Sequence, residues 1–222
     1  DNILKEIKGE SFTVDSVKKG NKKRKPYAPY TTSTLQQDAS RLLGFTSKKT
    51  MSIAQQLYEG TDLKGIGQTA LVTYIRTDSV RSSPEAVSEI RQIIEKRFGN
   101  EFIPKKPKVY TNKNKSQDAH EAIRPAHFDI TPEQAEDLLT KDQYKLYKMI
   151  WKRFMTSQMA DALVDTVTAD IAAGQHIFRS SGETVVFQGY LVVFSDKSGS
   201  DDEDLSSDVS MPELNEHEKL FC

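Results

Sequence analysis

The chain has 222 residues, and its 31 lysines and arginines nearly balance 32 acidic residues, for a net charge of −1. This length suffices for one or two domains whose cores need no covalent staple. A single cysteine, Cys222, excludes a disulfide framework and argues against a cysteine zinc site, so a reducing compartment is expected. The longest apolar run, residues 190–194, is far too short to cross a membrane. Since the chain begins at Asp1 and ends at Cys222, we expect a piece of a longer protein.

Charge is unevenly distributed along the chain. Residues 1–30 carry eight basic and four acidic side chains, whereas residues 196–222 carry two basic and nine acidic ones. Two basic clusters stand out, at residues 22–25 and in the acid-free stretch 104–115. Each is compatible with a polyanion-binding surface and with a solvated loop, and the sequence leaves both open.

The first half of the chain predicts a strand followed by paired helices. Apolar and polar residues alternate over 11–17, which is typical of a half-buried strand. Ser33 and Gln36 form a capping-box pattern that predicts a helix ending at Gly44. A second helix is expected over 47–60, and the β-rich run 69–75 is expected to be a strand. Helix, tight turn, helix and strand is the order of a helix-turn-helix unit with a following β element.

The second half predicts more helices and then strands. Pro84 and the Thr131-Pro132 pair mark two helix starts, and a long helix over 141–159 places Trp151 on a core face. Strands are then expected over 165–171, 176–179 and 184–194, with a turn at 180–182, before a flexible acidic loop at 195–210.

This change of pattern predicts an α+β architecture of two domains. A helical domain with a helix-turn-helix-like unit, residues 34–158, is expected to be inserted into a β-rich domain. That domain would be discontinuous and formed by residues 1–33 and 159–222.

One cluster with chemical potential is Tyr74-Ile75-Arg76-Thr77-Asp78. In an extended chain, Tyr74, Arg76 and Asp78 point to the same side. A tyrosine hydroxyl ionises near pH ~10 and is a poor nucleophile unaided, but a neighbouring guanidinium favours the phenolate and stabilises charge on a phosphoryl group. This spacing is also common in a stacked surface pair, so the residues leave both interpretations open.

A second cluster contains His120 and Arg124, four residues apart. Histidine can carry protons near neutral pH. A capped surface turn is the alternative, and the absence of a second nearby histidine argues against zinc. The acidic run 201–204 lies in a Ser/Gly-rich stretch, which favours solvation over a magnesium site, so the chain's metal-site prediction is none.

These segments together resemble the bacterial type IA DNA topoisomerases, of the topoisomerase I branch. The resemblance rests on four motifs in the family's order and rough spacing, and residues 146–159 extend it. The motifs are PYTTSTLQQ (29–37), KKTMSIAQQLYEG (48–60), LVTYIRTDS (71–79) and QDAHEAIRP (117–125).

The resemblance implies roles for individual residues. Tyr74 matches the family's nucleophile, which cleaves single-stranded DNA, stays bound to the 5′ phosphate and later allows resealing. Arg76 matches the arginine that holds the scissile phosphate, and His120 matches a histidine near it. Asp78 and Arg124 fall in the same motifs and are expected near the DNA backbone.

The resemblance also implies what lies elsewhere. The family's Mg²⁺ is held by carboxylates of a TOPRIM domain upstream in sequence, which nothing here matches. We therefore expect a bacterial cytoplasmic, nucleoid-associated enzyme whose partners are DNA and the remaining domains of the same polypeptide. The complete enzyme would relax negative supercoils, and this piece would be inactive in isolation. The alternatives are a non-catalytic DNA-binding helix-turn-helix module and a structural hinge.

Overall fold

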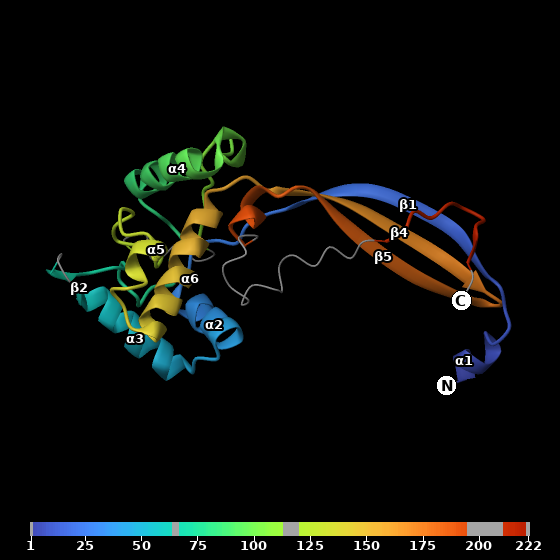
Figure 1. The fold of residues 1–222 in the computed structure, drawn as a ribbon, viewed down its shortest axis with the longest axis horizontal. Coiled ribbons are helices and arrows are strands. Elements are labelled where there is room, and N and C mark those ends of the chain that lie inside the picture. Colours follow the sequence, from blue (N-terminus) through green and yellow to red (C-terminus); the bar gives the residue numbers. More distant parts are fainter. Residues whose placement is uncertain (1, 64–66, 113–119, 195–210, 221–222) are drawn as a thin grey trace. The chain divides into compact units, whose positions relative to one another are not determined.

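The computed structural model describes residues 2–63, 67–112, 120–194 and 211–220, and it combines helices with antiparallel strands (Figure 1). Its contacts divide the chain into two compact units. A β unit comprises residues 1–25 and 161–222, and a helical unit comprises residues 26–160. Residues 26–33, which the sequence pattern groups with the strands, belong to the helical unit.

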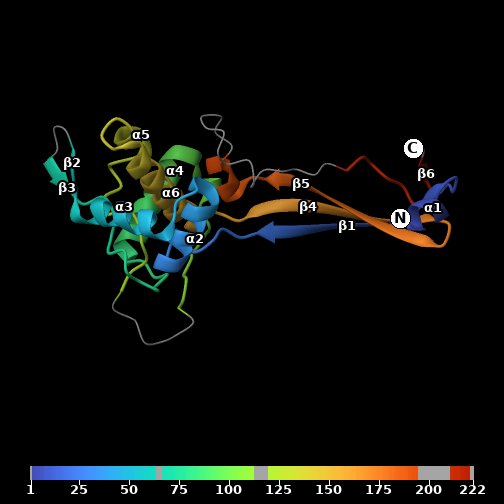
Figure 2. The same cartoon turned by 90° about the horizontal axis from the view of Figure 1, so that it is seen from below.

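The described part of the β unit contains an antiparallel sheet in the order β5-β4-β1-β6 (Figure 2). Gly174, at φ 56°, lies in the turn between β4 and β5, where glycine adopts a left-handed conformation without a side-chain clash. The strands predicted at 11–17 and 165–171 are confirmed in position, and both are longer than predicted. The elements of the unit are α1 (Asn2–Glu6), β1 (Phe12–Arg24), β4 (Ala162–Ala173), β5 (His176–Phe187) and β6 (Lys219–Leu220).

Two predictions for the C-terminal strands are wrong. Residues 180–182 form no turn, because β5 continues through them and pairs them with residues 167–169 of β4. Residues at the end of the predicted last strand form a 3-10 helix, η2 (Gly189–Phe194). The small residues at 180–182 suit a turn locally, but pairing with a neighbouring strand overrides that preference.

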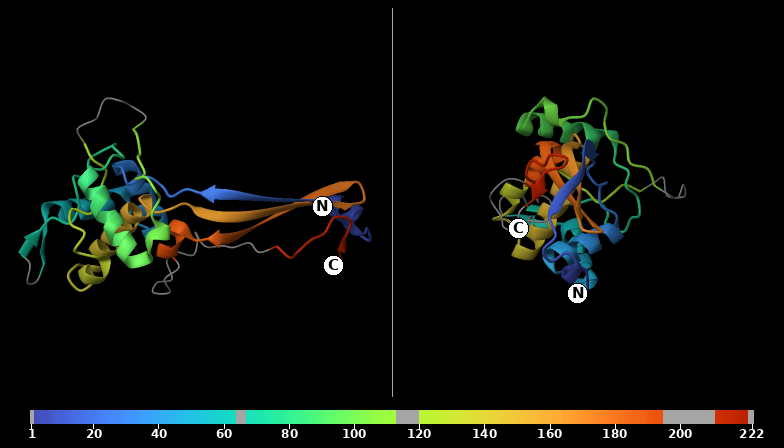
Figure 3. Two further views of the ribbon diagram at one scale, coloured as in Figure 1. Left: turned by 90° about the horizontal axis from the view of Figure 1, so that it is seen from above. Right: turned by 90° about the vertical axis from the view of Figure 1, so that its right-hand side faces the viewer.

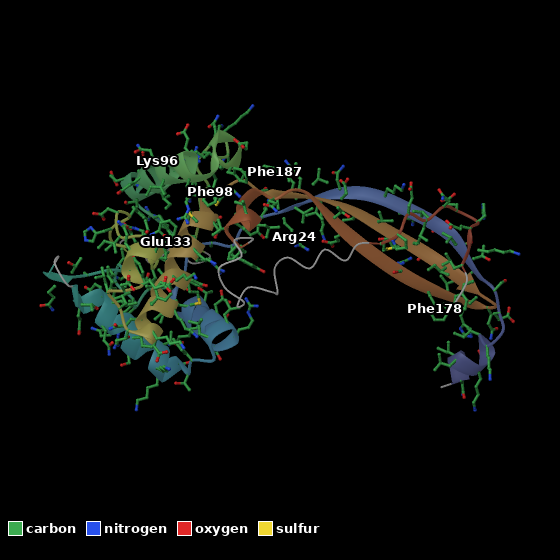
Figure 4. The ribbon with its side chains drawn as sticks, in the orientation of Figure 1. Arg24, Lys96, Phe98, Glu133, Phe178 and Phe187 are labelled. Atoms are coloured by element: carbon green, nitrogen blue, oxygen red, sulfur yellow. The ribbon has the colours of Figure 1, made fainter. Side chains whose placement is uncertain are left out.

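The β unit has a thin apolar core and cross-strand ion pairs. Val14, Ala169 and Leu214 are buried together on the sheet. The basic cluster at 22–25 largely belongs to β1 and is not a loop, and Lys22 and Arg24 both bind Glu183 of β5 (Arg24 is labelled in Figure 4). The hydrogen bond from Lys22 lowers the pKa of the Glu183 carboxyl, and the charges of Lys22 and Arg24 add to this effect.

The helical unit follows the predicted order closely. The helices at 47–60, after Ser83, after Thr131 and from 141 onward are confirmed, although the one after Thr131 is a single turn. The elements are α2 (Thr32–Leu43), α3 (Ser47–Glu59), β2 (Thr61–Leu63), β3 (Gly67–Thr69), α4 (Pro84–Phe98), η1 (Asn100–Phe102), α5 (Pro132–Ala135) and α6 (Lys141–Ser157).

The start of α2 differs from the prediction. The N-cap is Thr31, whose hydroxyl accepts from the Thr34 amide while the Thr34 hydroxyl accepts from the Thr31 amide. The capping box is therefore two residues earlier than the predicted pair Ser33 and Gln36. Gly44 ends the helix at φ 66°, as predicted.

Helix α6 forms the centre of the helical core and packs against α2, α3, α4 and α5 (Figures 1 and 3). Trp151 is 1% exposed, which confirms its predicted core position, and Phe154 is fully buried and stacks on Phe128. Large buried side chains from several elements meet here, so the unit is a firm support for the segments on its surface. Among the described residues, no helix has the length and apolarity needed to span a bilayer.

The predicted strand at 69–75 is wrong. Thr69 ends β3, and Val72 forms an isolated bridge with Pro125, but residues 73–79 belong to no sheet. The β-rich composition favours a strand locally, but the chain bends at residues 75–76 and no neighbouring strand pairs along its length.

Candidate active site

The extended segment 71–79 alternates between buried and exposed side chains. Leu71, Ile75, Thr77 and Ser79 are buried, whereas Tyr74, Arg76 and Asp78 are exposed. All three side chains are exposed, as expected, but the chain bends at residues 75–76, so the prediction that they share one side of a straight strand stays a prediction. The odd-numbered residues attach the segment to the helical unit, and the even-numbered ones from Tyr74 onward face outward.

Thr73 attaches this segment to the motif that contains His120. Its amide donates to the Arg124 carbonyl at 2.9 Å, and its hydroxyl donates to the Ala122 carbonyl at 2.8 Å. The Thr73 hydroxyl also accepts from the Arg124 amide at 3.0 Å. Two motifs that lie about fifty residues apart in sequence are thereby fixed side by side, next to Tyr74.

The other end of the segment is held by Asn112. Its side-chain carbonyl accepts from the Val80 amide at 2.9 Å, and its side-chain amide donates to the hydroxyl of the buried Ser79. The Arg81 carbonyl accepts from the Ala122 amide at 2.7 Å. The segment is therefore fixed at both ends and has little freedom between them.

Tyr74 lies among aromatic rings. Its side chain is 44% exposed, and its ring contacts Tyr58 of α3 edge-on, with centroids 5.5 Å apart. The His120 ring also lies near the Tyr74 ring, in a tilted arrangement with the two centroids 6.2 Å apart. Within the described residues the Tyr74 hydroxyl makes no hydrogen bond, so it is available to a ligand. The structure thus brings together Tyr74 and His120, which the sequence singled out separately.

The charged side chains of these two motifs differ in the ion pairs and hydrogen bonds that they form. Arg76 and Asp78 form no ion pair or hydrogen bond through their side chains with any described residue. Arg124 is 13% exposed in its side chain, binds Glu121 at 2.8 Å and donates to the Pro125 carbonyl at 2.9 Å. Arg76 therefore presents an available guanidinium, whereas Arg124 stabilises the turn that holds His120.

The residues preceding α2 are fixed by Arg153 of α6. Its guanidinium donates to the Ala28 carbonyl at 2.7 Å, pairs with Asp38 at 3.2 Å and lies against the rings of Tyr27 and Tyr30. Burial raises the pKa of Tyr30 far above its ordinary value, so its hydroxyl stays protonated and donates to Asp38 at 2.8 Å. This network fixes the start of α2 relative to the core.

The described residues do not fit a metal centre. Among them, no group of three or more histidine, cysteine, aspartate and glutamate side chains is placed to hold an ion. The acidic run 201–204 and residues 113–115, the end of the basic stretch 104–115, lie outside the described residues. The site near Tyr74 thus offers a phenol, a guanidinium and an imidazole, a set suited to a phosphate group.

A family model of DNA topoisomerase matches residues 1–222. DNA topoisomerase 1 of Rickettsia felis (strain ATCC VR-1525 / URRWXCal2) is 41% identical over 221 residues, which cover 98% of this chain and 28% of that protein. The structure of full-length topoisomerase I from Thermotoga maritima superposes with a TM-score of 0.81 at 37% identity, over 99% of this chain and 34% of that one.

The chain therefore belongs to the DNA topoisomerase family. Within that family it groups with bacterial topoisomerase I, the type IA branch that its motifs resemble. It spans about a third or less of the length of these two relatives.

Sequence reasoning missed several residues that build the site. Tyr58 lies within a quoted motif, but nothing in its spacing links it to Tyr74. Thr73 and Asn112 act through hydrogen bonds between segments distant in sequence, which local patterns do not reveal. Thr32 belongs to the same group and contacts the backbone on either side of Arg76.

Proposed function

We propose that this chain is the tyrosine-bearing part of a type IA DNA topoisomerase. The observation that carries the proposal is the exposed Tyr74 hydroxyl beside Arg76 and His120 on a rigidly attached segment. The proposed substrate is DNA, chiefly single-stranded, as the resemblance to the type IA enzymes implies. The enzyme would relax negative supercoils by passing a strand through the break.

The reaction exchanges one phosphodiester for another. The Tyr74 oxygen attacks the phosphorus and loses its proton, while the bond from phosphorus to the 3′ oxygen breaks and that oxygen gains a proton. The product is a 5′-phosphotyrosine and a free 3′ hydroxyl. Resealing is the reverse, and because one ester replaces another, no external energy source is required.

Neighbouring side chains have distinct roles in this scheme. Arg76 binds the non-bridging phosphate oxygens and stabilises the charge that builds up on them in the transition state. His120, adjacent to the Tyr74 ring, serves as a proton carrier. Asp78, which is also exposed, is proposed to lie beside the DNA backbone. Arg124 contributes less to binding, because its guanidinium is already engaged by Glu121.

Mg²⁺ is proposed as a cofactor of the complete enzyme and not of these residues. The described residues supply no suitable carboxylate cluster. The resemblance implies that carboxylates of a TOPRIM domain would hold the ion elsewhere in a longer polypeptide, and this chain would then be inactive in isolation. We assign no step of the reaction to the ion.

The alternative is a non-catalytic DNA-binding module. The pair α2 and α3, joined by residues 44–46, has the order of a helix-turn-helix unit. Simple binding does not require an exposed tyrosine next to an arginine that pairs with no described residue, so the catalytic function is favoured. Either function predicts weak binding of single-stranded DNA that declines steeply with salt, and affinity unaffected by salt would contradict both.

The experiment that separates the two uses the full-length polypeptide. It would be incubated with a single-stranded oligonucleotide, denatured and digested, and the DNA-linked peptide would be identified by mass spectrometry. We expect the adduct on Tyr74, and none in a Tyr74→Phe variant that still binds DNA. Binding without any adduct in the unmodified protein would support the module.

A further inference from the structure

The first residue of α2 is bonded to the backbone on both sides of Arg76. The Thr32 amide donates to the Thr77 carbonyl at 2.9 Å, and the Thr32 hydroxyl donates to the Ile75 carbonyl at 2.7 Å. The same hydroxyl accepts from the Thr77 amide at 2.9 Å. Thr32 thus contacts the two residues that flank Arg76.

These bonds replace the sheet that the segment lacks. Residues 73–79 belong to no strand, so no regular ladder fixes their backbone. Ile75 and Thr77 are buried, and within the described residues the Ile75 carbonyl and the Thr77 amide and carbonyl bond to Thr32, so the loss of these bonds would be costly away from water. The bonds to Thr32 therefore determine the backbone conformation from which the Arg76 side chain projects.

The chemistry of Thr32 suits this task. A hydroxyl can donate and accept at once, which valine of the same shape cannot do. Thr32 also lies in the first turn of α2, where an amide has no partner within the helix and is free to bond elsewhere. The start of α2 is itself held by the Thr31 capping box and by Arg153, so the support is firm.

We propose that Thr32 is a positioning residue that acts through Arg76, holding the guanidinium where it meets the scissile phosphate next to Tyr74. The effect on DNA cleavage rests on the proposed function, whereas the role of Thr32 in holding the backbone around Arg76 does not. Misplacement of a catalytic group by about 1 Å can reduce a rate by up to ~100-fold. Loss of the hydroxyl should therefore affect cleavage more than binding.

The test compares Thr32→Val with Thr32→Ser and with a matched control, Thr50→Val, in the full-length polypeptide. Thr50 is fully buried, and its hydroxyl donates to the Thr46 carbonyl at 3.0 Å. This hydrogen bond does not involve residues 71–79. We expect Thr32→Val to slow single-turnover cleavage about tenfold while DNA affinity changes by less than about threefold. Thr32→Ser should restore the rate, and Thr50→Val should leave it unchanged.

A double-mutant cycle identifies the route of the effect. If Thr32 acts through Arg76, Thr32→Val should slow cleavage much less in an Arg76→Ala background than in the unmodified one. An equal loss in both backgrounds, or a Thr32→Val rate equal to that of Thr50→Val, would overturn the proposal.

Hydrogen exchange tests the same inference without any reaction. Amide exchange in residues 75–78 should accelerate in Thr32→Val and not in Thr50→Val, because the Thr77 amide loses its acceptor. Unchanged exchange would overturn the inference even if the adduct forms on Tyr74. Accelerated exchange without any adduct in the unmodified enzyme would instead refute the proposed function.

Discussion

The two units of this chain are stabilised in different ways. The helical unit surrounds α6 with large buried side chains, among them Trp151 and Phe154. The β unit relies on long antiparallel ladders, ion pairs at Glu183 and a thin layer that includes Val14 and Leu214. The candidate site therefore lies on the unit with the deeper core, whose close packing resists small displacements of Tyr74.

Phe154→Ala should cause the largest loss of stability. It removes a fully buried ring from α6, so we expect a cost of about 3–5 kcal/mol. Denaturant unfolding followed by the fluorescence of Trp151, the single tryptophan of the sequence, measures this directly. A loss below about 1 kcal/mol would show that the helical core is less tightly packed than described.

Leu214→Ala should destabilise the β unit by about 2 kcal/mol, at the low end for a buried leucine, because its core is thin. Circular dichroism of the strands should report the loss. The Trp151 fluorescence transition should shift little, since that residue belongs to the other unit. Equal shifts of both signals would contradict the separation into two units.

Tyr58→Leu should reduce cleavage about tenfold, close to 1.4 kcal/mol, with little change in stability. The edge-on contact between Tyr58 and Tyr74 restrains the nucleophile, and leucine cannot reproduce it. Tyr58→Phe keeps the ring and is the matched control. Single-turnover cleavage by the full-length protein distinguishes the two variants. Equal rates for Tyr58→Phe and Tyr58→Leu would show that the ring contact does not contribute to cleavage.

Glu183→Gln should have the smallest effect, about 0.5 kcal/mol at neutral pH, because the ion pairs are partly exposed. The pKa of Glu183 is lowered in the folded chain, so its contribution is present above the ordinary carboxyl pKa and disappears as the pH falls through the folded value. In unfolding experiments over a pH series, the difference between Glu183→Gln and the unmodified chain should be present at neutral pH and should shrink as the pH falls below the ordinary carboxyl pKa. A difference that persists in acid would exclude the charge as its cause.

The sequence was informative where signals are local. The caps at Ser83 and Thr131, the stop at Gly44 and the apolar face with Trp151 all follow from short-range patterns and are confirmed. Tyr74, Arg76 and Asp78 are also exposed, even though the expected strand there is absent.

The capping box misplaced by two residues at the start of α2 is a local error, whereas other failures arise from pairing between segments distant in sequence. Residues 180–182 continue a strand because β4 lies beside them, and residues 73–79 form no strand because none does. The same holds for Thr32, whose bonds to Ile75 and Thr77 cross more than forty residues. No local pattern encodes such partners, so they became visible only in the structure.

In the proposed function, Tyr74 becomes linked to the 5′ phosphate of a cleaved DNA strand. The most direct measurement uses a single-stranded oligonucleotide labelled differently at its two ends, incubated with the full-length protein and denatured. We expect the 3′-labelled piece to remain attached to the protein, and Tyr74→Phe to abolish this attachment. Attachment of the 5′-labelled piece, or an adduct that survives Tyr74→Phe, would contradict the proposed function.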